Sequence, residues 1–117
     1  MSYLINHNNS SFSNSFEISG SKSESNRLII LNSIYKNLKI DNLSNSDDTV
    51  VLYKYVNNLE NYIDIHHAGT AMRFLTALLS IQNNKEFVVT GSKRMKQRPI
   101  EILVDALNNL GADISYK

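Results

Sequence analysis

Residues 20–38 read GSKSESNRLIILNSIYKNL. Apolar side chains recur here at the three- and four-residue spacing of one helical face, at Leu28, Leu31, Tyr35 and Leu38. The Gly-Ser residues before them are therefore predicted to form a loop and the first turn of an amphipathic helix over about 23–38. We expect an anion at this turn, because unpaired backbone N–H groups and the helix dipole favour negative charge there.

The side chains of this turn suit phosphate or carboxylate. Lys22 and Arg27 supply positive charge, and three serines supply hydroxyl donors. A Gly-Ser helix entry is also common where nothing binds, since Ser is a favoured helix cap. The turn is not the phosphate loop of nucleotide hydrolases, which places Gly directly before Lys, whereas here Ser21 separates Gly20 from Lys22.

Length and composition bound the class of protein. The chain has 117 residues, 42% of them hydrophobic, which suits one small globular domain or part of a larger one. With 12 basic and 11 acidic residues, no overall field attracts nucleic acid or a membrane surface. The absence of cysteine excludes disulfides, thiolate metal sites and a cysteine nucleophile.

The sequence shows no pattern typical of a metal site, a membrane-spanning helix or a secretory signal. The histidines at positions 7, 66 and 67 lack a metal-binding spacing, so we expect no metal. No apolar run approaches the roughly 20 residues of a membrane helix, and the N-terminus lacks the order of a secretory signal. We therefore expect a cytoplasmic protein without nucleic-acid or membrane partners.

Strands and helices are predicted to alternate, which indicates an α/β fold. Two short strands over 3–5 and 15–18 are expected to pair as a hairpin across an Asn/Ser-rich tract, and 39–43 as a brief strand or extended turn. Further strands are predicted over 62–65, 86–90 and 113–116. The second helix is expected to bury Leu52, Tyr55, Val56 and Leu59. The third runs through Phe74, Leu75, Leu78 and Leu79, and the fourth, opened by Pro99 and ended by Gly111, is expected to bury Leu103, Ala106, Leu107 and Leu110.

Two further loops carry groups that could bind an anion. Gly69 lets a ligand approach the backbone, and Thr70 is placed to cap the third helix. Residues 93–98 hold four cations, among them Arg94, without the interleaved aromatics of a nucleic-acid platform. Loops that join strands to helices gather at one end of a sheet, so the Lys22, Gly69 and Arg94 loops together predict a pocket for a polyanionic metabolite.

Two pairs of polar residues favour structural interpretations. Asp47 and Asp48 could be paired catalytic carboxylates, but their position at a helix start favours capping. The adjacent His66 and His67 are expected to be surface or packing residues rather than general bases.

The three loops resemble those of one family. The blocks GSKS with Asn26 and Arg27, AGTAMR at 68–73, and RMKQRPI at 94–100 followed by LVDAL at 103–107, are similar to 5-enolpyruvylshikimate-3-phosphate synthase, also called 3-phosphoshikimate 1-carboxyvinyltransferase. The resemblance covers nearly all of residues 16–117, and three blocks in the right order make it specific.

The resemblance implies a transferase of the shikimate pathway, in aromatic amino acid and chorismate biosynthesis. The family moves the enolpyruvyl group of phosphoenolpyruvate to the 5-hydroxyl of shikimate 3-phosphate and releases phosphate, with no metal or organic cofactor. By this similarity Lys22 acts in catalysis and bridges both substrates, while Ser23 and Arg27 hold shikimate 3-phosphate. Gly69, Thr70 and Arg94 would contact phosphoenolpyruvate.

The resemblance also implies an incomplete form of the enolpyruvyl transferase fold, an inside-out α/β barrel of repeated strand-helix units. Family members are monomers of two domains and more than four hundred residues, and their proton-transfer carboxylate and lysine lie in the later part. Residues 1–19 would hold strands of the domain completed by a C-terminal part, and 20–117 the first part of the other domain. We therefore expect a fragment that is inactive alone.

The sequence departs from the family pattern at three positions, and two rival interpretations stay open. Ser19, His67 and Phe74 stand where the family usually has Pro, Asn and Pro. The UDP-N-acetylglucosamine enolpyruvyl transferase shares the fold but carries Lys-Asn where this chain has Lys22-Ser23, and usually a loop cysteine. A non-catalytic anion-binding or interaction module derived from the same fold is the alternative from another class.

Overall fold

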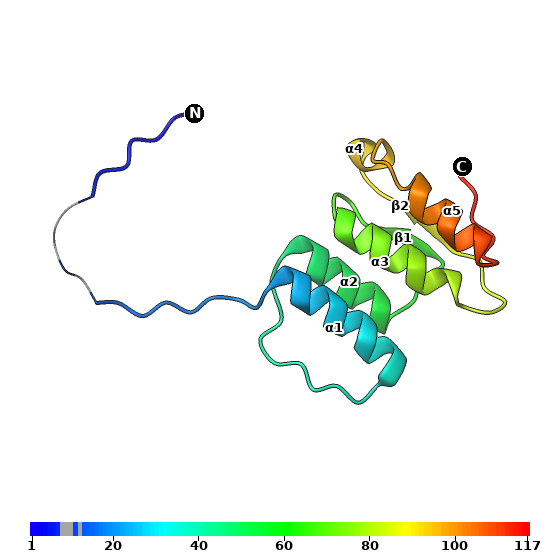
Figure 1. Ribbon diagram of the computed structural model, residues 1–117, viewed down its shortest axis with the longest axis horizontal. Helices are drawn as coiled ribbons and strands as arrows, with labels where there is room; N and C mark the ends of the chain where they lie inside the picture. The colour runs from blue at the N-terminus through cyan, green and yellow to red at the C-terminus, as the bar shows by residue number, and fades with distance from the viewer. Residues whose placement is uncertain (8–10, 12) are drawn as a thin grey trace.

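The computed structural model describes residues 1–7, 11 and 13–117. Over these residues a long N-terminal segment is followed by five helices and two short strands (Figure 1). The elements are α1 Lys22–Tyr35, α2 Asp47–Asn57, β1 Tyr62–Asp64, α3 Gly69–Ser80, β2 Val88–Thr90, α4 Lys93–Lys96 and α5 Glu101–Asn109. The mixed helix and strand content confirms the α/β prediction at this level, while the barrel remains an expectation.

The two strands form a parallel pair connected through α3. Tyr62 lies opposite Val88 and Asp64 opposite Thr90. Because the strands are parallel, both end at the same edge of the pair. Backbone bonds extend the pairing beyond the strands, since the amide of Ile65 donates to the Thr90 carbonyl at 2.9 Å and that of Ser92 to the His66 carbonyl at 2.7 Å. The loops that follow β1 and β2 are therefore neighbours, as predicted for the Gly69 and Arg94 loops.

A single apolar core lies between the strands and the first three helices. Helices α1, α2 and α3 lie side by side, and the strand pair and α5 lie beyond α3 (Figure 1). The largest fully buried apolar side chains come from α2, from β1 with the residue after it, and from α3: Leu52, Ile63, Ile65 and Leu75. Tyr55 and Val56 also contribute, as predicted, but Leu59 lies beyond the end of α2 and is exposed.

Helix α1 packs through polar residues as well as apolar ones. Ser25, Asn26 and Ile29 are its buried residues. The Ser25 hydroxyl accepts from the Ser44 amide at 2.9 Å, and the Thr49 hydroxyl donates to the Asn26 side-chain oxygen at 2.7 Å. These bonds satisfy the Asn26 side-chain oxygen and the Ser25 and Thr49 hydroxyls at the junction of α1 and α2. The Nδ2 of Asn26 is buried at the same junction and has no hydrogen-bond partner among the described residues.

The predicted apolar face of α1 is therefore wrong. Leu31, Tyr35 and Leu38 are 42%, 66% and 40% exposed, and α1 ends at Tyr35 rather than at Leu38. Helix α1 is instead oriented with Ser25 and Ile29, which are one turn apart, facing α2. Hydrogen bonds from Ser44 and Thr49 select this face, and they cannot be read from apolar spacing alone.

Several predicted strands are absent from the described part of the chain. The described residues among 1–19 form no strand and are exposed, so the predicted hairpin is not present there. Its tip falls partly on residues 8–10 and 12, outside the described residues. Residues 113–116 also form no strand. Residues 39–43, predicted as a brief strand or an extended turn, form no strand and bend at Asn42. Short apolar runs become strands only where a neighbour completes the ladder, and among the described residues only β1 and β2 have one.

The C-terminal elements differ in detail from the prediction. The basic stretch contains the one-turn helix α4, capped by the Ser92 hydroxyl, which accepts from the Met95 amide. Helix α5 begins at Glu101, two residues after Pro99. Only Val104 is buried in α5, while Ala106 and Leu110 are exposed, because only one side of this helix meets α3. Among the described residues no helix is both long and apolar enough to cross a membrane.

Candidate functional site

Asp48 connects the entrances of two helices. Its Oδ1 accepts hydrogen bonds from the backbone amides of Thr70 at 2.7 Å and Ala71 at 3.1 Å, in the first turn of α3. Its Oδ2 lies 3.2 Å from the Nζ of Lys22, the first residue of α1. One carboxylate therefore joins the first and second of the predicted anion-binding loops.

The environment of Asp48 keeps this group ionised. Burial by itself would raise the pKa of Asp48, since its side chain is 16% exposed. The amides of Ala71 and Thr70, together with the ammonium of Lys22, outweigh that effect, and the net result is a lowered pKa. Asp48 was predicted to cap its own helix, but it occupies the N-terminus of α3 instead. The amide of Thr70 consequently has an internal acceptor.

The predicted residues of the first loop lie at the exposed end of α1. Ser21 is the N-cap, and its hydroxyl accepts from the Glu24 amide, which confirms the predicted helix entry. Lys22, Ser23 and Arg27 are all exposed. The guanidinium of Arg27 donates to the Ser23 carbonyl at 2.8 Å and lies 5.8 Å from the centre of the Phe74 ring. These side chains form a cationic surface at the α1 entrance that a ligand can reach.

Gly69 is the first residue of α3, and its lack of a side chain makes room for Arg98. A Cβ atom at this position would collide with the guanidinium of Arg98 and lie 3.4 Å from the Cε of Met95. Ala68, not Thr70, is the N-cap residue of α3, so the predicted capping role of Thr70 is wrong. Helix α3 starts at Gly69, so Thr70 is the second residue of its first turn.

Arg73 fixes the segment after α4 against α3. Its guanidinium donates to the Gly69 carbonyl at 3.1 Å and to the Pro99 carbonyl at 2.9 Å. The arginine therefore holds the end of the basic stretch near the start of α3. This contact explains how Arg98, only one residue before Pro99, comes to lie over Gly69.

A cationic cavity of about 240 Å³ lies beside this contact. Its lining residues are His67, Ser92, Arg94, Met95 and Arg98. Met95 is buried, while the two arginines are exposed. The predicted Gly69 and Arg94 loops thus meet, with two guanidinium groups at one cavity. Arginine presents planar, multiple donors that match carboxylate and phosphate.

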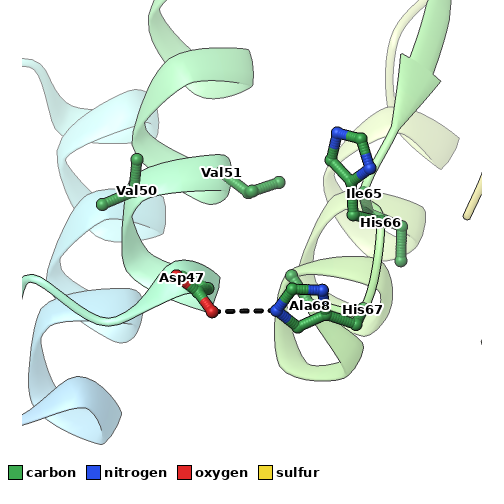
Figure 2. A pocket seen from close by; sticks show the side chains of 7 residues that line it. All are labelled: Asp47, Val50, Val51, Ile65, His66, His67 and Ala68. Carbon is green, nitrogen blue, oxygen red and sulfur yellow. Dashed lines mark hydrogen bonds and ion pairs between the residues drawn. The ribbon is translucent and has the colours of Figure 1, made fainter. Parts of the chain in front are cut away.

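A second cavity, of about 320 Å³, lies on the other side of His67. Figure 2 shows its lining, in which Val51 of α2 points toward the loop after β1. The Asp47 carboxylate reaches across this space, and its Oδ2 lies 2.8 Å from the His67 Nε2 (Figure 2). His66 points elsewhere, and its Nδ1 lies 3.8 Å from a carboxylate oxygen of Asp64. Both imidazoles are 72% exposed, which confirms the predicted surface positions.

Sequence reasoning missed the contacts made by Asp47, Asp48 and Arg98. Both aspartates had been interpreted as caps of α2, whose N-cap is Ser46. The Asp47 carboxylate instead points to the loop before α3, 20 residues away along the chain, and that of Asp48 to the start of α3, 22 residues away. The predicted first loop also follows no strand in the described residues. Among these residues no group of three His, Cys, Asp or Glu side chains could hold a metal ion.

Comparison with known proteins identifies the family. The family model described as EPSP synthase (3-phosphoshikimate 1-carboxyvinyltransferase) matches residues 54–117. A 3-phosphoshikimate 1-carboxyvinyltransferase of Bacteroides fragilis is 48% identical over 101 residues, which cover 86% of this chain and 24% of that protein. The enzyme of the same name from Buchnera aphidicola subsp. Cinara cedri is 39% identical over 127 residues, covering 86% of this chain and 29% of that protein.

A much longer protein also contains a region similar to this chain. The pentafunctional AROM polypeptide of Komagataella phaffii is 38% identical over 128 residues, covering 83% of this chain and 8% of that protein. The chain thus spans about a quarter of the length of the bacterial relatives it matches. No solved structure matches it. Since the family model covers more than half of the residues and includes the loops of Gly69 and Arg94, the chain belongs to the EPSP synthase family.

Proposed function

We propose that this chain contributes to the transfer of the enolpyruvyl group from phosphoenolpyruvate to the 5-hydroxyl of shikimate 3-phosphate, with release of phosphate. Family membership supports the reaction class. The observation that carries the proposal is the set of contacts at Asp48, which joins Lys22 to the start of α3. The Asp48 carboxylate therefore connects the cationic entrance of α1 to the start of α3, next to the arginine cavity.

Two anionic substrates can then be assigned to two neighbouring surfaces. Lys22, Ser23 and Arg27 at the entrance of α1 would bind the phosphate of shikimate 3-phosphate. Gly69 and Arg94 would bind phosphoenolpyruvate at the arginine cavity, and Lys22 would reach both substrates. Thr70 would act beside them through its side chain, since its amide already donates to Asp48.

The physical contribution of these residues is to hold two negatively charged molecules close together. The substrates repel each other, and fixed cations reduce that repulsion in the ground state. The same cations stabilise charge that develops when the two molecules join in the tetrahedral addition intermediate. Asp48 holds the ammonium of Lys22 in place at 3.2 Å, which fixes the position of this cation.

The domain organisation belongs to the same proposal. Residues 20–117 would form part of one enolpyruvyl transferase domain, and residues 1–19 would belong to a neighbouring domain. The exposure of the described residues among 1–19 supports this division, since they bury nothing against α1 to α5.

Calorimetric titration with shikimate 3-phosphate tests the proposal. We expect binding that weakens as salt is raised, because the contacts are between exposed charges. A Lys22→Ala, Arg27→Ala variant should lose this binding. A Lys39→Ala, Lys117→Ala variant is the matched control, since it removes two exposed cations that pair with Asp41 and Glu86.

Two results would contradict the proposal. A folded chain that does not bind shikimate 3-phosphate would remove the substrate assignment of the α1 entrance. An equal loss of shikimate 3-phosphate binding in the two double variants would show that the substrate is attracted by the net charge of the chain and not by the α1 entrance. Binding of many unrelated anions with the same affinity would favour the alternative function, a non-catalytic anion-binding module.

A further inference from the structure

In the part of the chain that the structure describes, Arg94 and Arg98 are the two arginines whose guanidinium groups have no internal partner. The ion pairs of these residues use lysine or histidine as the base. The other two arginines, Arg27 and Arg73, donate to backbone carbonyls. Arg94 and Arg98 both line the arginine cavity, and each keeps five N–H donors that match the oxygens of carboxylate or phosphate.

The amides in the first turn of α3 already have acceptors. A helix start is otherwise a ready site for an anion. The amide of Gly69 donates to the His67 carbonyl at 3.0 Å, and those of Thr70 and Ala71 donate to the Asp48 carboxylate. That carboxylate takes the place of an anion at this helix end, and its negative charge repels a second one. An anion near Gly69 therefore needs a cation from another part of the chain.

The backbone around Pro99 brings the Arg98 guanidinium to this place. The Arg73 side chain bonds the Pro99 and Gly69 carbonyls at 2.9 and 3.1 Å, so the residue before Pro99 lies beside the start of α3. The Arg98 amide donates to the Met95 carbonyl at 3.0 Å, which fixes the same turn. Because Gly69 has no side chain, the guanidinium fits over it; its central carbon would lie 3.2 Å from a Cβ atom there.

We propose that Arg98 is an anion-binding residue of the arginine cavity, and that Gly69 acts there by giving space to this guanidinium instead of exposing its own backbone to the anion. Arg94 supplies the second guanidinium of the same cavity, so the two arginines together hold the carboxylate or phosphate group of one small anion. The inference rests on the proposed function only for the identity of the natural anion, phosphoenolpyruvate.

Sulfate is the probe, because it is a small tetrahedral oxyanion like a phosphate group. Its binding to the full chain is measured by NMR titration of backbone amides at neutral pH and about 0.1 M salt, where charges more than about 10 Å away are largely screened. Arg98→Gln should raise the dissociation constant of sulfate by about two- to fivefold, the range of one exposed charge contact.

Lys96→Gln is the matched control for this substitution. Lys96 is an exposed cation of the same basic stretch, but the residues that line the cavity do not include it. Its loss should therefore change the dissociation constant of sulfate by less than about 1.5-fold. Since Arg98 and Lys96 are both exposed, neither substitution removes a buried contact, and urea unfolding should give both variants the midpoint of the unaltered chain.

A double-mutant cycle tests the role of Gly69. Gly69→Ala should displace the Arg98 guanidinium and weaken sulfate binding. In a chain that already carries Arg98→Gln, the same substitution should weaken binding no further, because the guanidinium that it displaces is absent. If the anion instead approached the backbone of Gly69, the two effects would add.

Three results would overturn the inference. The first is sulfate binding by Arg98→Gln as tight as that of the unaltered chain, or no sulfate binding by the unaltered chain. The second is an equal loss of sulfate binding in Arg98→Gln and Lys96→Gln, which would show attraction to the charge of the whole basic stretch. The third is additivity in the cycle. The comparison of Arg98→Gln with Lys96→Gln stands by itself whatever Gly69→Ala does to the stability of the fold.

Titrations with the two substrates separate this inference from the proposed function. If the sulfate results are as expected but shikimate 3-phosphate and phosphoenolpyruvate do not bind, the proposed function fails and the inference stands. If both substrates bind to the unaltered chain while Arg98→Gln leaves sulfate binding intact, the inference alone fails.

Discussion

Asp48→Asn should destabilise the fold by removing the charge that joins α1 and α3. The carboxylate accepts from two backbone amides at 2.7 and 3.1 Å and pairs with Lys22 at 3.2 Å. An asparagine oxygen can still accept from those amides, so the loss is the difference between charged and neutral hydrogen bonds, about 0.5–2 kcal/mol for each bond. The half-exposed ion pair adds at most about 1 kcal/mol. Because relief of the buried charge offsets part of this, we expect a net loss of about 1–3 kcal/mol.

The assay is urea unfolding of both proteins over a range of pH. At neutral pH the midpoint of the variant should fall by about 1–2 M. The folded pKa of Asp48 is lowered, so its stabilisation is complete above the ordinary aspartate pKa of about 3.9 and is lost as pH falls through the folded value. The two unfolding curves should therefore approach each other in acid.

Asp47→Asn is the matched control, because its carboxylate is 75% exposed and bonds only to His67 among the contacts of the described residues. It should change the free energy of unfolding by less than about 1 kcal/mol. Equal stability of Asp48→Asn and the unaltered chain at neutral pH would refute the reasoning. A difference that persists unchanged in strong acid would also refute it, since the cause could not then be the carboxylate charge.

Three further substitutions probe the core, the entrance of α1 and the arginine cavity. Leu52→Ala should lower the free energy of unfolding by about 2–5 kcal/mol in urea, because this fully buried side chain leaves a cavity; a loss below about 1 kcal/mol would contradict its place in the core. Gly20→Ala should cost about 1–3 kcal/mol in the same assay, since the added methyl collides with the backbone carbonyl of Asn42, and an unchanged midpoint would show that the loop moves freely. Gly69→Ala should displace the flexible end of Arg98 and weaken sulfate binding at the arginine cavity several-fold, measured by NMR titration of backbone amides, with little loss of stability. Strong destabilisation with intact sulfate binding would contradict this placement.

Several of the elements followed from local signals in the sequence. Ser21 and the serine-rich turn predicted the start of α1, and apolar spacing predicted the second and third helices. The strand predicted over 86–90 contains β2, which spans Val88–Thr90. Such signals depend on residues within about two turns of one another, which is why a single sequence reveals them.

Other predictions failed where a distant partner decides the structure. The runs at 3–5, 15–18 and 113–116 have strand-like composition but form no strand among the described residues, because no neighbouring strand supplies their hydrogen bonds. The apolar spacing of α1 predicted the wrong buried face, since Ser25 and Asn26 bond to groups in the segment from Ser44 to Thr49.

The candidate site divides in the same way. The sequence alone determined which residues are cationic and which loops precede helices, and so predicted Lys22, Gly69 and Arg94, whose substrate-binding roles stay a prediction. Only the tertiary structure decided that the Asp48 carboxylate occupies the start of α3 and that Arg98 packs over Gly69. The physical reason is that a charge selects its partner by distance in space. The packing of α2 against α3 brings Asp48 to its partners, and the parallel pairing of β1 and β2 brings the Gly69 and Arg98 segments together.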